Sequence, residues 1–146
     1  MKFYLASSFK NKVKVEQVAY YLTKRGHTIT TQWWHTDFKK TVSGNDAEWY
    51  ADERVQAISK RNFKGIEDAE VLILVARKEP VKYNGANIEL GYALALGKPC
   101  YSLGYLERSA MYCPVIKCKA IDELLVKIAT NANQSSSLCV KHDIKI

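Results

Sequence analysis

The chain has 146 residues and a formal net charge of +7, a length that suits one domain with a substantial core. Its hydrophobic fraction of 47% and charged fraction of 25% are ordinary for a soluble globular protein. No apolar run approaches the ~20 residues of a membrane span, and the N-terminus enters a strand-like segment without signal-peptide features. We therefore expect a soluble, cytoplasmic protein that binds no membrane.

The basic charge is spread along the chain, because its lysines do not gather into a continuous arm. A solvated basic surface is therefore favoured over a nucleic-acid footprint, and it would also suit a small phosphorylated ligand. The four cysteines, Cys100, Cys113, Cys118 and Cys139, lack C-x-x-C pairing and metal-ligand spacing. They predict buried free thiols in a reducing cytosol, and the sequence predicts neither a metal nor another cofactor.

Strand and helix signals alternate from the N-terminus onward. The first strand is expected at 2–6, and the following helix buries Val15, Val18, Ala19 and Leu22 at helical spacing. The later elements are, in order, a strand at 27–31, a loop at 36–45, a helix from 47 to about 64, a buried strand at 71–76, a polar loop at 77–84, a helix within 85–97, strands at 99–103 and 115–118, and a helix at 121–129.

This alternation predicts a single α/β domain over residues 1–130, with a parallel sheet of about five strands and helices on both faces. Residues 131–146 are interpreted as a polar linker and a C-terminal tail. In such sheets a ligand lies outside the carboxyl ends of the strands. Residues 4–9, the segment after Ala76 and the entry to the 85–97 helix should therefore meet at one cleft.

Glu89 is the most informative residue of the chain. It falls in the expected first turn of a helix that is apolar on nearly every side, with Asn87 as its expected cap. One interpretation is that the helix dipole and nearby backbone N–H groups hold the carboxylate. The other is that Glu89 lines a cleft and does chemistry there, since Glu is rarely buried without a partner. The segment alone leaves both open.

Other candidate residues have ordinary explanations. No dinucleotide or P-loop signature is present. Ser7 and Ser8 could meet a phosphate at a helix start, although plain N-capping is favoured. Trp33 and Trp34 could stack a base, although one core tryptophan and one covering a loop is the favoured alternative. His27 is expected to pack beside a strand.

Four segments together resemble the nucleoside 2-deoxyribosyltransferase family. They are Y-L-A-S-S-F at 4–9, L-x-x-x-G-H-x-I-T at 22–30, G-I-x-x-A-x-V-L-I-L at 65–74, and G-x-N-I-E-L-G-Y-A-x-A-x-G-K-P at 85–99. The resemblance runs in order from residue 2 to about 125. It implies a flavodoxin-like (Rossmann-like) fold and a nucleoside or nucleotide substrate. The family includes base-exchanging transferases and hydrolases that cleave deoxynucleoside 5′-monophosphates.

The resemblance also implies roles for individual residues. Glu89 matches the nucleophile that forms a deoxyribosyl ester, and Tyr4 matches a tyrosine that orients it. Ser8 matches the position where family hydrolases hold the 5′-phosphate, and Ser109 resembles a serine that reaches the phosphate across a subunit interface. A homodimer or larger homo-oligomer is implied. The full expected substrate-binding set is Ser7, Ser8, Phe9, Trp34, Gly85, Asn87, Ser109 and Met111.

The sequence departs from the family pattern at two places. Asn62 stands where the family usually carries an Asp that handles the proton of the base or holds the base, and an amide cannot act as a general acid. Tyr83 and Asn84 occupy the loop position of a base-contacting carboxylate. Three alternatives therefore stay open: a transferase, a 5′-monophosphate N-hydrolase and a non-catalytic nucleotide-binding module.

Overall fold

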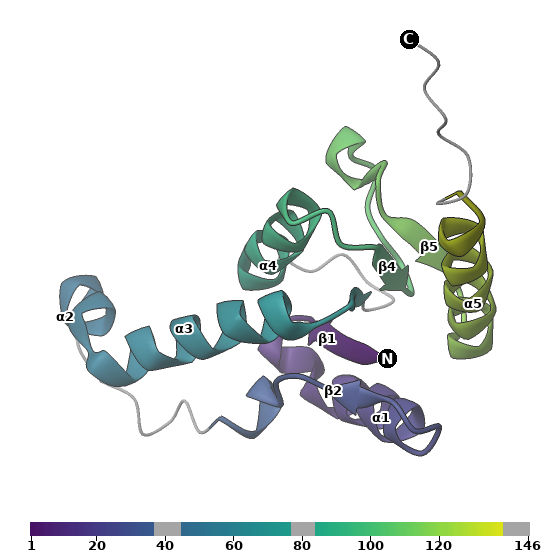
Figure 1. The fold of residues 1–146 in the computed structure, drawn as a ribbon. Coiled ribbons are helices and arrows are strands. Elements are labelled where there is room, and N and C mark those ends of the chain that lie inside the picture. The colour runs from purple at the N-terminus through teal and green to yellow at the C-terminus, as the bar shows by residue number, and fades with distance from the viewer. Residues whose placement is uncertain (37–44, 77–83, 139–146) are drawn as a thin grey trace, which may run out of the picture.

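The five strands of the fold form one parallel sheet in the order β2-β1-β3-β4-β5 (Figure 1). The computed structural model describes residues 1–36, 45–76 and 84–138, and the strand bounds that follow refer to that part of the chain. They are β1 Lys2–Ala6, β2 Thr28–Ile29, β3 Val71–Val75, β4 Cys100–Leu103 and β5 Ile116–Cys118. The predicted α/β class and parallel sheet are confirmed.

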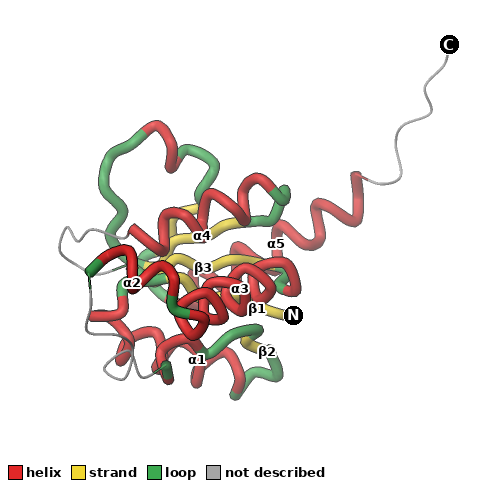
Figure 2. Tube along the Cα trace, turned by 90° about the vertical axis from the view of Figure 1, so that its left-hand side faces the viewer, coloured by secondary structure: helices red, strands yellow, loops and turns green. Residues whose placement is uncertain are grey.

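The helices form a layer on each side of this sheet, α3 and α4 on one face and α1 and α5 on the other (Figures 1 and 2). The α-helices are α1 Lys12–Thr23, α2 Asp46–Ala51, α3 Glu53–Asp68, α4 Asn84–Ala95 and α5 Ile121–Leu138. Short 3₁₀ turns lie at η1 Phe9–Asn11, η2 Trp33–His35 and η4 Ala110–Tyr112.

The Tyr4 side chain lies on the face of the sheet that α3 and α4 cover, beside Gly65 of α3 and Glu89 of α4. Tyr4 pairs with Leu72, and Leu74 pairs with Ser102, and paired residues of a parallel sheet point their side chains to the same face. Strand β3 is buried along its whole length, as its continuous apolar run predicts for a central strand. The four predicted core positions of α1 are also buried.

Three boundaries differ from the prediction. The helix expected from residue 47 is two helices, because Asp52 is extended and its carboxylate caps α3 through the Arg54 N–H. The polar tract from Asn131 to Ser137 continues α5. The second strand is confined to Thr28–Ile29.

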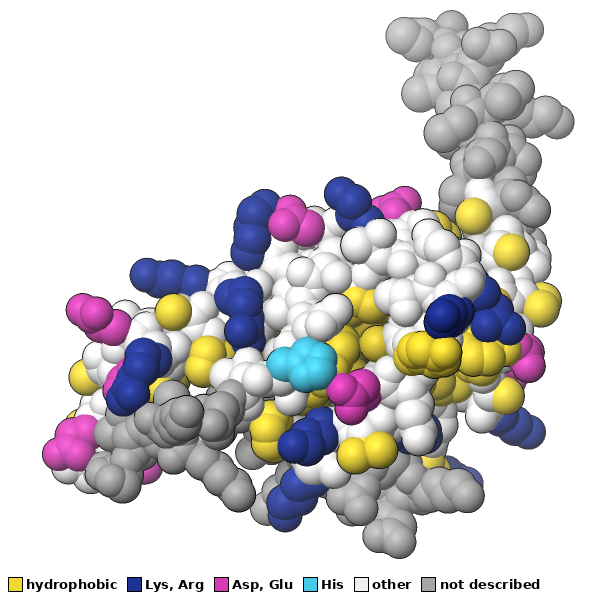
Figure 3. Space-filling view, turned by 90° about the horizontal axis from the view of Figure 1, so that it is seen from below, with side chains coloured by type: hydrophobic (Ala, Val, Ile, Leu, Met, Phe, Trp, Pro, Cys, Tyr) yellow, Lys and Arg dark blue, Asp and Glu magenta, His cyan; other side chains and the backbone are white. Residues whose placement is uncertain are grey.

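Of the cysteines that the structure describes, two are buried and one is exposed. Cys100 and Cys118 are buried free thiols, but Cys113 is exposed, so its predicted burial is wrong; Cys139 lies outside the described residues. On the face drawn in Figure 3 the basic side chains are spread out, with acidic side chains between them. None of the described helices is long and apolar enough to cross a membrane.

Gly65 allows α3 to lie close to the sheet beneath the Tyr4 ring. A Cβ at this position would overlap the buried hydroxyl of Thr31 and lie 3.3 Å from Cδ2 of Tyr4. We expect Gly65→Ala to lower the free energy of unfolding by about 1–3 kcal/mol, because overpacking outweighs the gain in helix propensity. Urea unfolding measures the change. Gly91→Ala, with open space around the new methyl group, is the control and should be neutral or stabilising; equal stability of the two variants would contradict the packing argument.

Candidate active site

Three elements bring the predicted catalytic residues Glu89, Tyr4 and Asn62 together. Glu89 projects from α4, and its Oε1 accepts a 2.7 Å hydrogen bond from the hydroxyl of Tyr4 on β1. Asn62 on α3 donates its Nδ2 to the same oxygen at 3.4 Å. Residues 4, 62 and 89 are far apart in the sequence, so the fold itself assembles this cluster.

These contacts test the first of the two interpretations of Glu89, in which the helix start holds the carboxylate. Helix α4 begins at Asn84, so Glu89 lies in its second turn and Asn87 lies inside the helix rather than capping it. The hydrogen bonds to the carboxylate come from two side chains on other elements. The interpretation in which backbone N–H groups at a helix start hold Glu89 is therefore wrong, and the carboxylate instead has side-chain partners on β1 and α3.

Burial controls the ionisation of the cluster. Desolvation raises the pKa of Glu89 to about 7, and the hydrogen bonds from Tyr4 and Asn62 lower it only in part. Burial, followed by the nearby Glu89 charge, raises the pKa of Tyr4 far above its ordinary value. Tyr4 is therefore a neutral hydrogen-bond donor at physiological pH, and Glu89 titrates near neutrality. A carboxyl group shifted in this way is typical of functional sites.

The two serines that follow β1 do not act as helix caps. The Ser7 hydroxyl donates to the Val75 carbonyl at 2.6 Å, and Asn11 donates to both Ser7 Oγ and the Val75 carbonyl. These bonds hold the ends of β1 and β3 together. Ser8 precedes η1 without a side-chain capping bond. The favoured N-capping interpretation is thus wrong for both residues, and Ser7 has a structural partner.

The aromatic residues are more deeply buried than the sequence suggests. Trp33 and Trp34 are both buried, so neither covers a loop and neither face is open to a base. Trp33 donates its indole N–H to the Leu5 carbonyl. The indole N–H of Trp34 has no hydrogen-bond partner among the described residues, which keeps it a candidate donor to a ligand. Phe9 is exposed and lies tilted against Trp33, and His27 packs edge-on against Phe3 as expected.

Three of the remaining predicted substrate contacts lie around one hollow beside α4. Asn87, Ser109 and Met111 line one hollow of about 290 Å³ together with Tyr112. The hydroxyl of Tyr112 donates to Asn87 Oδ1 at 3.0 Å, and Ser109 accepts a bond from the Met111 N–H. Gly85, on the first turn of α4, is exposed with open space around its Cα. The structure therefore brings Ser109 and Met111 together with Asn87 of α4, whereas Ser8 lies between β1 and η1.

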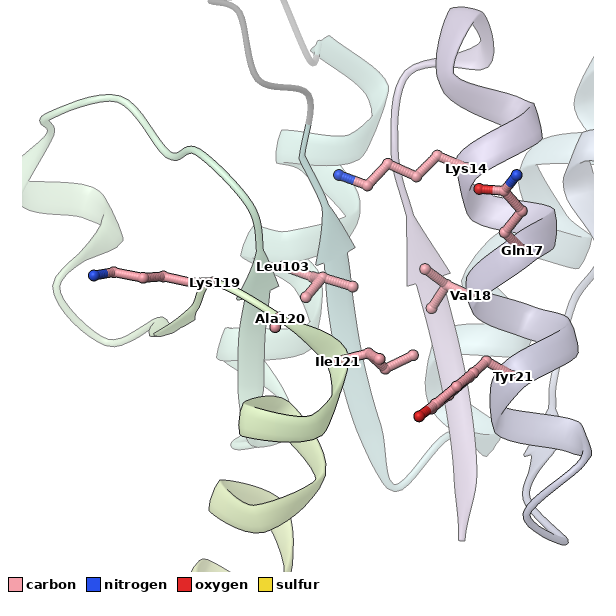
Figure 4. A pocket seen from close by; sticks show the side chains of 8 residues that line it. All are labelled: Lys14, Gln17, Val18, Tyr21, Leu103, Lys119, Ala120 and Ile121. Carbon is pink, nitrogen blue, oxygen red and sulfur yellow. The ribbon is translucent and has the colours of Figure 1, made fainter.

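A second hollow of about 280 Å³ lies on the opposite face of the sheet, between α1 and α5 (Figure 4). Its polar side chains do not converge, because two are hydrogen-bonded to the protein, and Gln17 and Lys119 lie at opposite ends of the hollow in Figure 4. Lys14 donates to the Ala76 carbonyl, Tyr21 donates to Asp122, and Lys119 extends away from Lys14 in Figure 4. The hollow is therefore a gap in helix packing without converging polar groups.

The structure adds one residue to the site that the sequence interpretation missed. Arg61, directly before Asn62, donates from Nη2 to Asn62 Oδ1 and to Thr36 Oγ1. In the sequence, its position next to Asn62, where the chain departs from the family pattern, could have pointed to it.

No group of three or more His, Cys, Asp or Glu side chains that could hold a metal occurs within residues 1–36, 45–76 and 84–138. Tyr83 lies outside those ranges, and Asn84 is the first residue of α4.

Comparison with known proteins gives the family. Solved structures with the same fold include the CMP N-glycosidase BcmB of Clostridium botulinum, with 20% identity, a TM-score of 0.53 and coverage of 88% of this chain and 99% of that one. A 2-deoxyribosyltransferase from Bacillus psychrosaccharolyticus has 21% identity, a TM-score of 0.58 and coverage of 85% and 90%. No curated protein matches the sequence. The family model of nucleoside 2-deoxyribosyltransferase matches residues 3–137, so the chain belongs to the nucleoside 2-deoxyribosyltransferase family.

Proposed function

We propose that this protein cleaves the N-glycosidic bond of 2′-deoxyribonucleosides or their 5′-monophosphates and transfers the deoxyribosyl group to a second base or to water. Glu89 is the nucleophile. The observation that carries the proposal is the partly buried Glu89 carboxylate, held by Tyr4 and Asn62 from two other elements. Both hydrogen bonds reach Oε1, so Oε2 is the oxygen that would attack. Family membership supplies the substrate class.

The reaction follows the double displacement of a retaining glycosidase. Glu89 Oε2 attacks the anomeric carbon, the C1′–N bond breaks, and the base leaves with the electron pair. The product is a deoxyribosyl ester on Glu89. A second base, or water, then attacks the same carbon and releases the carboxylate. Asn62 can hydrogen-bond a base but cannot protonate it, so the departing base takes its proton from solvent or from the acceptor.

A substrate panel tests this proposal. The protein is incubated with the four common deoxynucleosides and their 5′-monophosphates, with and without an acceptor base, and free base is separated by chromatography. Base released without acceptor indicates a hydrolase, and exchanged nucleoside indicates a transferase. If no substrate reacts and none leaves a deoxyribosyl adduct detectable by intact mass, the reaction proposal is wrong and the non-catalytic nucleotide-binding alternative replaces it.

The 5′-phosphate is the second part of the proposal. Ser8 makes no capping bond and lies one residue after the Ser7 contact that joins β1 to β3. We expect kcat/KM to be higher for a 5′-monophosphate than for its nucleoside, and Ser8→Ala to remove about 10–100-fold of that advantage, the value of a hydrogen bond to a charged group. Ser59→Ala on α3, an exposed serine, is the control. An advantage unchanged in Ser8→Ala would exclude this role for Ser8.

Assembly is the third part of the proposal. Although α4 is apolar on nearly every side, Ile88 on this helix is 63% exposed, and Met111 on η4 is 79% exposed. A second copy of the chain would cover exposed apolar side chains of this kind. We expect light scattering at micromolar concentration to give a dimer or larger species, and Met111→Asp to shift it toward monomer. A wild-type mass of 16.6 kDa would contradict this assembly.

The proposed location is the cytoplasm. The free thiols of Cys100 and Cys118 suit a reducing compartment.

A further inference from the structure

Arg61 connects the candidate site to a neighbouring segment of the chain. It lies on the exposed side of α3, and its Nη2 donates to two oxygens: Thr36 Oγ1 at 2.9 Å and Asn62 Oδ1 at 3.3 Å. Thr36 directly follows η2. The guanidinium therefore bridges α3 and the end of η2, and it contacts the amide that contacts Glu89.

The two contacts of Asn62 fix the orientation of its amide. A side-chain amide has a donor end and an acceptor end of nearly the same shape, and its partners decide which end points where. The Arg61 guanidinium can only donate, so it selects the carbonyl end. The NH₂ end is then directed to Glu89 Oε1, at 3.4 Å, where it matches an ionised carboxylate, which can only accept.

We propose that Arg61 is a positioning residue that holds the Asn62 amide with its NH₂ toward Glu89 and so favours the ionised, attacking form of the nucleophile. The consequence for catalysis rests on the proposed function, whereas the effect of Arg61 on the ionisation of Glu89 does not. It also gives a physical role to an Asn where the family pattern has an Asp. An Asp at position 62 would compete with Glu89 for protons, whereas an oriented amide stabilises the Glu89 anion.

The prediction for Arg61→Gln follows from the groups that face Glu89. Among the described residues these are the Tyr4 hydroxyl from β1 and the Asn62 amide from α3, with the Arg61 cation behind the amide. Without the guanidinium the amide is free to rotate. Its carbonyl then faces Glu89 for part of the time, and a carbonyl favours the protonated carboxyl group over the carboxylate.

The test reads the Glu89 carboxyl directly, without substrate. The protein is labelled with ¹³C at glutamate side-chain carboxyls, and the Glu89 signal, assigned by its absence in Glu89→Gln, is followed from pH 4 to 9. We expect Arg61→Gln to raise the titration midpoint by about 0.5–1 pH unit, a part of what a hydrogen bond to a charged group contributes. Lys60→Gln, which removes one positive charge from the same exposed helix, is the control and should shift the midpoint by much less.

A double mutant separates positioning from simple charge. If Arg61 acts through the amide, Arg61→Gln causes no further shift in an Asn62→Ala background. A shift of equal size in both backgrounds, an unmoved midpoint in Arg61→Gln, or the same shift in Lys60→Gln each overturns the proposal. Thermal melting verifies that all variants are folded.

Kinetics supply the second readout. On any substrate that the panel identifies, Arg61→Gln should lower kcat at neutral pH, move the acid limb of the kcat profile to higher pH, and leave KM nearly unchanged. An increase in KM alone would mean that Arg61 binds substrate directly, and would overturn the positioning role. If no substrate is found, the proposed function fails while the titration still decides the role of Arg61.

Discussion

Glu89→Gln is expected to abolish N-glycosidic turnover while leaving the protein folded. Gln keeps the shape of Glu and can still accept hydrogen bonds from Tyr4 and Asn62 on its carbonyl oxygen, but an amide cannot form the ester intermediate. The rate should fall at least about 10⁴-fold, the order seen when a catalytic nucleophile is removed. Free-base release on the best substrate of the panel measures the loss. Glu53→Gln, an exposed residue at the start of α3, is the matched control, and near wild-type turnover in Glu89→Gln would eliminate the mechanism.

The same variant should gain stability at high pH. The pKa of Glu89 is about 7 in the folded protein against an ordinary value of 4.5. Between these values the folded state binds more protons than the unfolded state, so the free energy of unfolding falls as pH rises. The full loss is about 3 kcal/mol. We expect Glu89→Gln to exceed wild type by about 1–3 kcal/mol at pH 8.5 and to match it near pH 4. A constant difference across this range would show that Glu89 titrates normally.

Tyr4→Phe is expected to lower kcat about 10–100-fold at pH 7, because its hydroxyl donates the shortest hydrogen bond to Glu89 and such bonds to charged groups contribute about 1.5–3 kcal/mol. Loss of that bond raises the pKa of Glu89, so part of the activity should return above pH 8. The measurement is the pH dependence of kcat, with KM determined at each pH.

Tyr101→Phe is the matched control for Tyr4→Phe. Tyr101 is also a buried tyrosine on the sheet, but it lies on β4 and accepts a bond from Asn131 of α5, on the opposite face. Its variant should keep the wild-type pH profile. If Tyr4→Phe also keeps that profile, the hydroxyl does not orient or stabilise the nucleophile.

The sequence was most informative where a residue or a run of residues is compatible with few structural environments. A buried apolar run such as 71–75 can only be a central strand in an alternating α/β pattern, and Glu89 in an apolar segment requires a partner. It was less informative about which side chains would be those partners. Tyr4 came only from the family resemblance, because nothing in a strand sequence shows that its tyrosine meets a glutamate 85 positions later.

The missed features depend on tertiary contacts or on local capping. Arg61 is an ordinary helix-surface cation by sequence, and only its bonds to Thr36 and Asn62 distinguish it. The break between α2 and α3 depends on the Asp52 cap, which competes with a helical pattern that continues on both sides. The burial of Trp34 depends on the elements around it, which a dipeptide pattern does not specify.

The shortness of β2 gives the sheet a stable centre and a labile edge. Strand β3 is fully buried between two hydrogen-bonded neighbours, whereas the edge strand β2 pairs with β1 only through Lys2↔Thr28 and Phe3↔Ile29. Amide hydrogens in β3 should therefore exchange with solvent only on global unfolding, and those of β2 through small local openings. Tyr4 has its backbone on β1, which stays paired with β3 when β2 opens. Transient opening of this edge would therefore leave Tyr4 in place, so the nucleophile keeps its shortest hydrogen bond while the edge of the sheet fluctuates.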